Sequence, residues 1–419
     1  VPAALPVIEI PEFHFHKVAP LFSNLPEAKQ TVDIQPMEQF NQGWGTILYR
    51  TTLPETTLAG TTLKITEVHD WAQIYAGGKL LARLDRRKGE FTTTLPALKK
   101  GTQLDILVEA MGRVNFDKSI HDRKGITEKV ELISGNQAKE LKNWTVYNFP
   151  VDYSFIKNKK YNDTKILPAM PTYYKSTFKL DKVGDTFLDM STWGKGMVWV
   201  NGHAMGRFWE IGPQQTLFMP GCWLKEGENE ILVLDLKGPA KASIKGLKKP
   251  ILDMLREKAP ETHRKDGEKL KLAGEKVTHE GAFTPGNGWQ EVRFAAPVKG
   301  RYFCLEALSP QANDNIAAVA EFDVLGADGK PVSREHWKIR YADSEETRSG
   351  NRTADKIFDL QESTFWMTVD NVPYPHQLVI DLSKVETVTG FRYLPRAEKG
   401  YPGMIKEYRV YVKPADFNY

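Results

Sequence analysis

The chain has little cysteine, no long apolar run and almost no excess of charge. Its 419 residues include two cysteines, Cys222 and Cys304, which we expect in different domains and therefore not in a disulfide. No run of about 18 apolar residues occurs, so the sequence predicts no membrane-spanning helix. The net charge is +4, and basic residues are interleaved with acidic ones, so no basic stripe indicates a nucleic-acid partner.

Motifs of phosphate, dinucleotide and serine-nucleophile chemistry are also missing. The sequence contains no phosphate-binding loop, no G-x-G-x-x-G and no G-x-S-x-G. Strands and helices do not alternate along the chain, which excludes a TIM barrel and a doubly wound sheet.

Many short segments with period-two alternation are present instead. Examples are GTILYRTTL, TLKITEV, WAQIYAG and LDILVEAM, separated by Gly, Asn and Asp. Short strands with turn residues every 8–12 positions are typical of β-sandwiches and jelly rolls. The sequence therefore predicts an all-β protein.

One hairpin pattern occurs twice. DWAQIYAGGKLLARLD (70–85) resembles KGMVWVNGHAMGRFW (195–209), and each is followed by a similar segment, LKKGTQLDILVEA (98–110) or LKEGENEILVLDL (224–236). The Asn-Gly pair at 201–202 predicts a tight turn with positive φ. The repeat predicts two jelly-roll domains, over 36–145 and 146–247.

The remaining segments complete the predicted domain organisation. Prolines at positions 2, 6 and 11 favour extended backbone, so residues 1–35 are interpreted as a linker. Residues 248–265 are expected to form a helical connector, with Pro250 at the first helical position and Pro260 ending the helix. Residues 266–419 are again rich in predicted strands.

Residues 30–247 resemble the β-domains of glycoside hydrolase family 35 β-galactosidases. The resemblance rests on long segments such as FNQGWGTILYRTTL, EAMGRVN and WVNGHAMGRFWEIGPQQTLFMP. In that family these jelly rolls follow a catalytic barrel that carries two glutamates, and galactosides are cleaved with retention. Glu228 and Glu230 lie in a predicted turn and strand edge, so the resemblance implies no catalytic residue in this chain. Five aromatic residues around the second hairpin are expected mainly in the core, namely Trp193, Trp199, Phe208, Trp209 and Trp223.

The C-terminal region resembles the discoidin, or factor V/VIII type C, fold of carbohydrate-binding module family 32. GWQEVRF…GRYFCLEALS…AAVAEFDVLG, which normally closes such a domain, comes first here. NRTADKIFDLQESTFWMT…GFRYLPR…EYRVYVK, which normally opens it, comes last. The order indicates a circularly permuted sandwich, because sandwiches with adjacent termini tolerate this change. The alternative is two truncated domains with unpaired sheet edges.

The discoidin resemblance also implies site residues. Asp359, Thr364 and Glu321 match positions that often hold a structural Ca²⁺, although Leu360 stands where the family has glycine. The alternative is a plain surface turn. Arg396 and Tyr401 match the sugar-binding loop. Trp366 matches a strand tryptophan that is expected in the core.

Together these resemblances predict the accessory region of a β-galactosidase. The expected partners are galactose-containing glycans and the catalytic barrel of the same parent chain. The chain does not begin with Met, so we expect a piece of a longer polypeptide. The expected parent is bacterial, and it is expected to be exported because polymer-degrading galactosidases act outside the cytoplasm. We also expect the face that met the barrel to be apolar. A stand-alone carbohydrate-binding or adhesion protein and a structural spacer without ligand are the alternatives.

Overall fold

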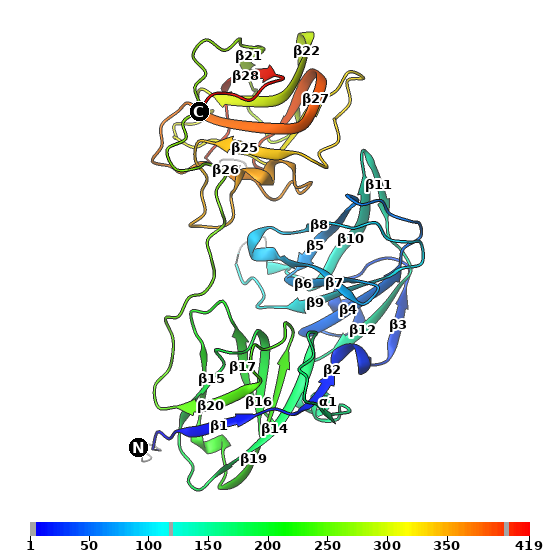
Figure 1. The fold of residues 1–419 in the computed structure, drawn as a ribbon, viewed down its shortest axis with the longest axis vertical. Helices are drawn as coiled ribbons and strands as arrows, with labels where there is room; N and C mark the ends of the chain where they lie inside the picture. The colour runs from blue at the N-terminus through cyan, green and yellow to red at the C-terminus, as the bar shows by residue number, and fades with distance from the viewer. Residues whose placement is uncertain (1–5, 117–119, 398–401) are drawn as a thin grey trace. The chain divides into compact units, whose positions relative to one another are not determined.

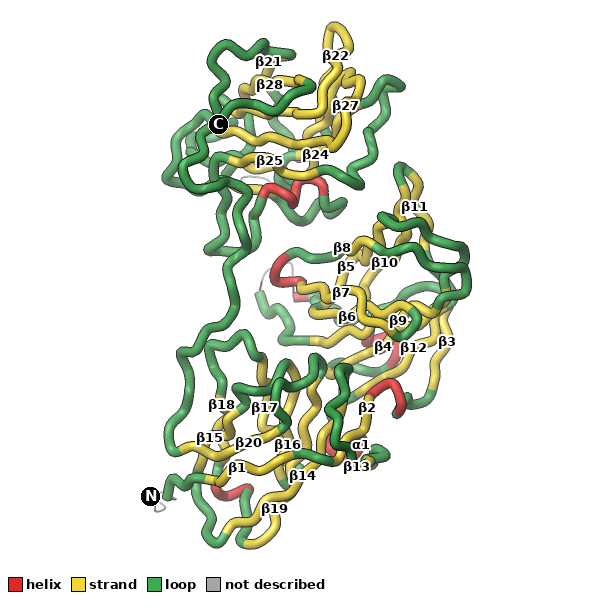
Figure 2. The backbone as a smooth tube through the Cα atoms, in the orientation of Figure 1, coloured by secondary structure: helices red, strands yellow, loops and turns green. Residues whose placement is uncertain are grey.

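The computed structural model describes residues 6–116, 120–397 and 402–419, and within them it is almost entirely strand and loop (Figures 1 and 2). The α-helix α1 (Tyr153–Lys157) has five residues. This confirms the predicted all-β class. None of the helices in the described residues has the length and hydrophobicity needed to span a bilayer. The chain divides into two compact units, Val1–Ala28 with Tyr147–Lys258, and Lys29–Val146 with Ala259–Tyr419.

The first unit is a sandwich of a six-stranded and a four-stranded sheet. The six-stranded sheet runs in the order β13 (Asn162–Asp163), β2 (Lys17–Pro20), β14 (Thr172–Leu180), β19 (Gly227–Asp235), β16 (Lys195–Val200) and β17 (His203–Trp209). The four-stranded sheet runs β1 (Ile10–His14), β20 (Ser243–Leu247), β15 (Thr186–Asp189) and β18 (Thr216–Met219). The core contains Trp193, whose ring meets Phe15 and Tyr174 edge-on at 5.1 Å. Trp199 and Phe208 are also buried as predicted, whereas Trp209 and Trp223 are only half-buried.

The prediction that residues 1–35 form a linker is wrong. β1 pairs with β20, placing Phe13 opposite Ile244, and β2 pairs with β14, placing Val18 opposite Tyr174. Prolines favour extended backbone, which is also the conformation of a strand, so composition alone could not distinguish the two. The structure satisfies the proline constraint by making β1 an edge strand.

Residues 29–146 of the second unit form another sandwich. Its six-stranded sheet runs β3 (Ala28–Thr31), β12 (Trp144–Phe149), β4 (Gly45–Thr52), β9 (Gln103–Ala110), β6 (Trp71–Ala76) and β7 (Lys79–Asp85). The four-stranded sheet runs β11 (Gln137–Glu140), β10 (Gly125–Ser134), β5 (Thr62–His69) and β8 (Thr92–Thr94). One apolar core, with Trp144 and Tyr49 fully buried, fills this sandwich.

The structure confirms the internal repeat. Both six-stranded sheets contain the same run of four strands, β4-β9-β6-β7 in one and β14-β19-β16-β17 in the other. The two hairpin turns have positive φ at both central residues, Gly77–Gly78 in one and Asn201–Gly202 in the other. Two positive φ values define the primed turn that matches strand twist. The similar sequences therefore build the same hairpin at the same place in each sheet.

Residues 259–419 form the discoidin-type domain. Its main sheet runs β21 (His279–Ala282), β28 (Glu407–Lys413), β22 (Gln290–Ala307), β27 (His376–Leu394) and β24 (Glu321–Leu325), and β25 (Lys338–Ala342) also pairs with β27. A short second sheet pairs β23 (Ala318–Val319) with β26 (Trp366–Met367). The ring of Phe391 lies 5.6 Å from Phe303 and 5.3 Å from Phe322, so both halves of the sequence share one core. This excludes two truncated domains, and Trp366 is buried in the same core as predicted.

The predicted helical connector over 248–265 is also wrong, because residues 250–262 have no helical backbone. The backbone N–H of Met254 donates instead to the carbonyl of Pro213 at 2.9 Å, and that of Arg256 donates to the carbonyl of Ile211 at 2.8 Å. Leu255, which lies within the segment predicted to be helical, is exposed. A helix of about ten residues has little stability of its own, so these tertiary hydrogen bonds decide the conformation.

Candidate functional site

The three residues predicted to hold a cation meet at one end of the discoidin-type domain. Asp359 follows the 3₁₀ turn η6 (Ala354–Phe358) and precedes β26. Its carboxylate accepts hydrogen bonds from the backbone N–H of Gln361 at 3.0 Å and from the Thr364 hydroxyl at 2.8 and 2.9 Å. Leu360 has a φ of 65°, the left-handed conformation that glycine adopts without strain. The loop thus keeps the conformation that a glycine would favour.

Glu321, the first residue of β24, completes this cluster from another strand. It is buried, and Arg334 contacts its Oε2, whereas Oε1 has no hydrogen-bond partner in the described part of the chain. Burial raises the pKa of Glu321 to about 8, partly opposed by Arg334 and reinforced by the charge of Asp359. Burial likewise raises the pKa of Asp359 to about 6. The buried Glu321 and the half-buried Asp359 are therefore close enough for the charge of Asp359 to disfavour that of Glu321.

These donors fit a hard cation such as Ca²⁺, which binds carboxylate, hydroxyl and carbonyl oxygens. The open Oε1 of Glu321, the Asp359 carboxylate and the Thr364 hydroxyl supply three such oxygens. Within the described ranges, no group of three or more His, Cys, Asp or Glu side chains is arranged to hold a metal. A cation here would consequently depend on Thr364 and on backbone carbonyls as well as on the two carboxylates.

The predicted sugar-binding residues lie on a neighbouring loop, of which only part is described. The Arg396 guanidinium lies 4.4 Å from the centre of the Phe365 ring, and its Nη1 lies 3.8 Å from Met367 Sδ. Tyr401 lies outside the described residues. The structure thus places Arg396 on an aromatic ring that directly follows Thr364 of the cation cluster.

Sequence reasoning missed two further groups beside Arg396. The Arg352 guanidinium lies 4.2 Å from the centre of the same Phe365 ring. Trp289 packs in the small apolar cluster that contains Phe365, and its indole N–H donates to Glu362 Oε1 at 3.1 Å. Residues 289, 352 and 396 come from three separate segments, so no motif or spacing connects them in the sequence.

The Glu228–Glu230 pair carries no sign of a catalytic role. Both residues lie in β19, although a turn was predicted for Glu228. Glu230 accepts a hydrogen bond from the Tyr153 hydroxyl and pairs with Lys175, both at 2.5 Å. Glu230 is therefore engaged in contacts with the neighbouring strand β14 and with the helix α1 of its own sandwich.

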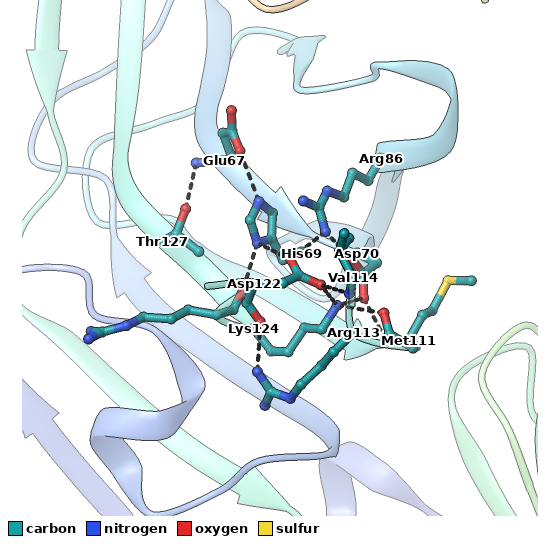
Figure 3. Close-up of polar contacts among 12 residues, drawn as sticks. Glu67, His69, Asp70, Arg86, Met111, Arg113, Val114, Asp122, Lys124 and Thr127 are labelled. Carbon is teal, nitrogen blue, oxygen red and sulfur yellow. Dashed lines mark hydrogen bonds and ion pairs between the residues drawn. The ribbon is translucent and has the colours of Figure 1, made fainter. Parts of the chain in front are cut away.

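A second polar cluster, also not predicted, is buried in the sandwich of residues 29–146, which is called the first β-domain below (Figure 3). The Lys124 ammonium, with no exposed surface, lies 2.7 Å from Asp70 Oδ2 and 2.7 Å from Asp122 Oδ2. Arg86 Nη1 contacts the other oxygens of the same carboxylates at 2.8 and 2.7 Å. His69 lies beside them, 3.3 Å from Asp122. Burial would raise the pKa of Asp122, but hydrogen bonds from Lys124, the backbone and Arg86 hold it at about 2.

This buried network fixes the loop that follows β9. The N–H groups of Met111 and Val114 donate to Asp70 and Asp122, and Lys124 donates to the Gly112 carbonyl. Arg113 donates to the carbonyls of Asp122 and Gly43. Each of these hydrogen bonds joins a charged side chain to a backbone group. The cluster therefore holds the backbone of the loop in one conformation.

Comparisons with known proteins find family matches for three segments of the chain. Residues 35–150 match "Beta-galactosidase, first all-beta domain" and residues 171–229 match "Beta-galactosidase, galactose-binding domain". Residues 341–419 match "F5/8 type C domain", and the strands β22 and β24 of the same core precede this match. The fold is thus that of tandem β-sandwich domains with a discoidin-type domain. The first two segments are thus similar to the β-domains of β-galactosidases, and the third is similar to F5/8 type C domains.

Curated relatives match about half of the chain. Beta-galactosidase-1-like protein 2 of Homo sapiens is 33% identical over 206 residues, covering 48% of this chain and 31% of the relative. Beta-galactosidase 1 of Dictyostelium discoideum is 33% identical over 240 residues, covering 53% and 35%. Beta-galactosidase of Xanthomonas manihotis is 31% identical over 220 residues, covering 52% and 35%. The chain spans about a third of the length of these relatives, and animal and amoebal relatives do not support the expected bacterial source.

Among solved structures, an α-L-rhamnosidase of Streptomyces avermitilis complexed with L-rhamnose covers 96% of this chain and 46% of its own. Its identity is 9% and its TM-score is 0.20, which is too low for an argument from structure.

Proposed function

We propose that the chain is the accessory, non-catalytic region of an exo-acting β-galactosidase that cleaves terminal β-galactosides with retention. The successive matches of 35–150 and 171–229 to β-galactosidase β-domains carry this proposal. The relatives are named β-galactosidases, and about two thirds of their length lies outside the match. The parent polypeptide is exported, since galactose-containing polymers are met outside the cytoplasm.

Within that parent, the β-domains brace the catalytic barrel. Supporting this role, the loop fixed by the Lys124 network exposes apolar side chains: Phe116 is 80% exposed and Ile120 is 56% exposed. Trp44, beside the Gly43 carbonyl that Arg113 binds, is 46% exposed. Exposed apolar side chains gathered near one another are typical of a docking surface. Phe116→Ser should leave the melting temperature of the isolated chain unchanged and lower that of a polypeptide that also carries the barrel.

The discoidin-type domain binds galactose-containing glycans and holds a structural Ca²⁺. Arg396 supplies N–H donors to sugar hydroxyls, as its place in the sugar-binding loop implies. Asp359, Thr364 and Glu321 hold the Ca²⁺, which keeps their loop in place and neutralises the two carboxylates. The open oxygen of Glu321 is the observation in favour of the cation.

Calorimetric titration tests the glycan proposal. The intact chain is titrated with galactose, lactose and a β-galactan oligosaccharide, with and without Ca²⁺, beside Arg396→Ala. Millimolar or tighter binding that the substitution abolishes supports a carbohydrate site at Arg396. No heat with any sugar leaves the chain as a bracing scaffold. The chain should show no hydrolysis of nitrophenyl β-galactoside, and turnover would refute the accessory role.

A further inference from the structure

We propose that the second unit carries an additional site, for a neutral oligosaccharide, in a cleft of about 760 Å³ between the first β-domain and the discoidin-type domain. Both walls of this cleft belong to one compact unit, Lys29–Val146 with Ala259–Tyr419. The inference rests on the proposed glycan-binding function and gives the glycan a second contact, since Arg396 is not among the described residues that line the space. The space is called the threonine cleft.

The first wall is the outer face of the four-stranded sheet of the first β-domain. Thr62 on β5 lies opposite Thr94 on β8 and opposite Ile133 on β10. Leu63 is fully buried in the core, and side chains alternate along a strand, so these three neighbours point away from the core. All three line the cleft, as does Gln137 on β11. This wall therefore offers two hydroxyl groups and an amide around an aliphatic side chain.

The second wall comes from the segment between β24 and β25 and from the 3₁₀ turn η6. Ser333, Glu335 and Phe358 line the cleft here. Their side chains are a hydroxyl, a carboxylate and a half-buried aromatic ring. The Phe358 ring meets the buried Trp337 edge-on, with 5.9 Å between the ring centres, which orients the ring. This wall thus combines an aromatic face with polar groups.

Hydrogen bonds join the two walls. The Asn136 side-chain amide donates to the Pro331 carbonyl at 2.9 Å, and both residues line the cleft. Lys356 Nζ donates to the Gly89 carbonyl at 3.3 Å, which ties η6 to the loop that precedes β8. The cleft is therefore bounded by segments that contact each other.

The lining favours a neutral ligand that is rich in hydroxyl groups. Three cationic and four acidic side chains among the described lining residues nearly balance. Arg334 and Arg392 both pair with Asp323 within the second wall. Hydroxyl and amide side chains donate and accept hydrogen bonds, as sugar hydroxyls do.

The apolar side chains and the volume extend this assignment. Ile133 and Phe358 lie on opposite walls and suit the C–H faces of sugar rings. The volume lies in the upper part of the roughly 300–1,000 Å³ range of small-molecule sites, so we expect more than one sugar ring to enter.

The test titrates the intact chain, with Ca²⁺ present, with a neutral β-galactan tetrasaccharide in an Arg396→Ala background. This background removes the Arg396 site, so the remaining binding reports on the threonine cleft. Thr62→Val and Thr94→Val remove hydroxyl groups with little change of shape. Each lost hydrogen bond should weaken binding roughly two- to tenfold, and the two substitutions together at least tenfold.

Thr52→Val is the matched control, because Thr52 is an exposed threonine of the same domain and is not among the described lining residues. It should bind the tetrasaccharide as the background does, and melting curves verify that each variant is folded. Equal binding by the background and by the chain with both cleft substitutions overturns the inference. Loss of all tetrasaccharide binding in the background alone also overturns it but keeps the proposed function.

Lactose measures the Arg396 site separately. Arg396→Ala should abolish lactose binding, whereas the two cleft substitutions in an otherwise unchanged chain should alter it less than twofold. If lactose binding is unchanged by Arg396→Ala, the Arg396 assignment is wrong, and weaker tetrasaccharide binding by the cleft variants still supports the threonine cleft. Absence of binding of both sugars to the unsubstituted chain overturns both proposals.

Discussion

Replacement of Lys124 by methionine should destabilise the first β-domain strongly. The ammonium is fully buried and bridges the carboxylates of Asp70 and Asp122, each at 2.7 Å. Methionine keeps the length of the side chain but removes the charge, which leaves Arg86 as the one cation contacting both carboxylates among the described residues (Figure 3). Breaking a buried ion pair by removing one partner costs about 3–5 kcal/mol.

The expected result is a fall of roughly 10–20 °C in the melting temperature of this domain, since about 1 kcal/mol corresponds to several degrees in a domain of this size. Differential scanning calorimetry resolves the transition of the altered domain from those of the other domains. Lys139→Met is the matched control, because Lys139 is 49% exposed and pairs at the surface with Glu55, which is 53% exposed. An exposed pair contributes about 0–1 kcal/mol, so this variant should melt within a few degrees of the wild type.

A second substitution tests the cause. Adding Asp122→Asn to Lys124→Met removes one of the carboxylates left without its cation, so part of the lost stability should return. If Lys124→Met melts like the Lys139→Met control, the buried network does not stabilise the domain and the reasoning is wrong. If the double variant is less stable than Lys124→Met, electrostatic repulsion is not the source of the loss.

Four further expectations follow from single positions. The folded-state pKa of Asp122 is about 2, below its ordinary 3.8, so the stability it contributes is full above about pH 4 and is lost as pH falls toward 2; Asp122→Asn should abolish that part of the acid transition seen by circular dichroism. A millimolar Ca²⁺ concentration should raise the melting temperature of the discoidin-type domain, because at 100 times the dissociation constant the ion adds about 2.7 kcal/mol to the free energy of unfolding. Asp359→Asn should remove the effect, and an equal rise in the variant places the ion elsewhere. Gly196→Ala should cost about 3 kcal/mol in urea unfolding, because its Cβ would lie 1.7 Å from the Leu234 carbonyl oxygen, whereas Gly288→Ala, with open space around it, should change little. Leu255→Ala should change the free energy of unfolding by less than about 0.5 kcal/mol, because Leu255 is exposed; a loss of 2 kcal/mol or more would mean that this segment packs as a buried helix.

The two candidate elements of the discoidin-type domain differ in how they arise. The Asp359 loop is local: its hydrogen bonds join residues within five positions, so the segment DLQEST carries most of its own geometry. Glu321 comes from a distant strand and was identified by resemblance to the family. The contact of Arg352 and Arg396 with the Phe365 ring has no such signal, because the two arginines meet on this ring only when their separate loops fold around it.

The sequence by itself determined the all-β class, the repeated hairpins and the permuted order of the C-terminal domain. These features depend on period-two alternation, on turn residues that accept positive φ, and on long matching segments, all of which are local properties of the chain. Only the tertiary structure decided that residues 10–20 are strands and that residues 250–262 are not a helix. In both segments the local preference is weak, and hydrogen bonds to distant backbone, such as that of Met254 to Pro213, select the conformation. The Lys124 network was likewise decided by folding, because a buried charge is stable only where partners from separate segments surround it.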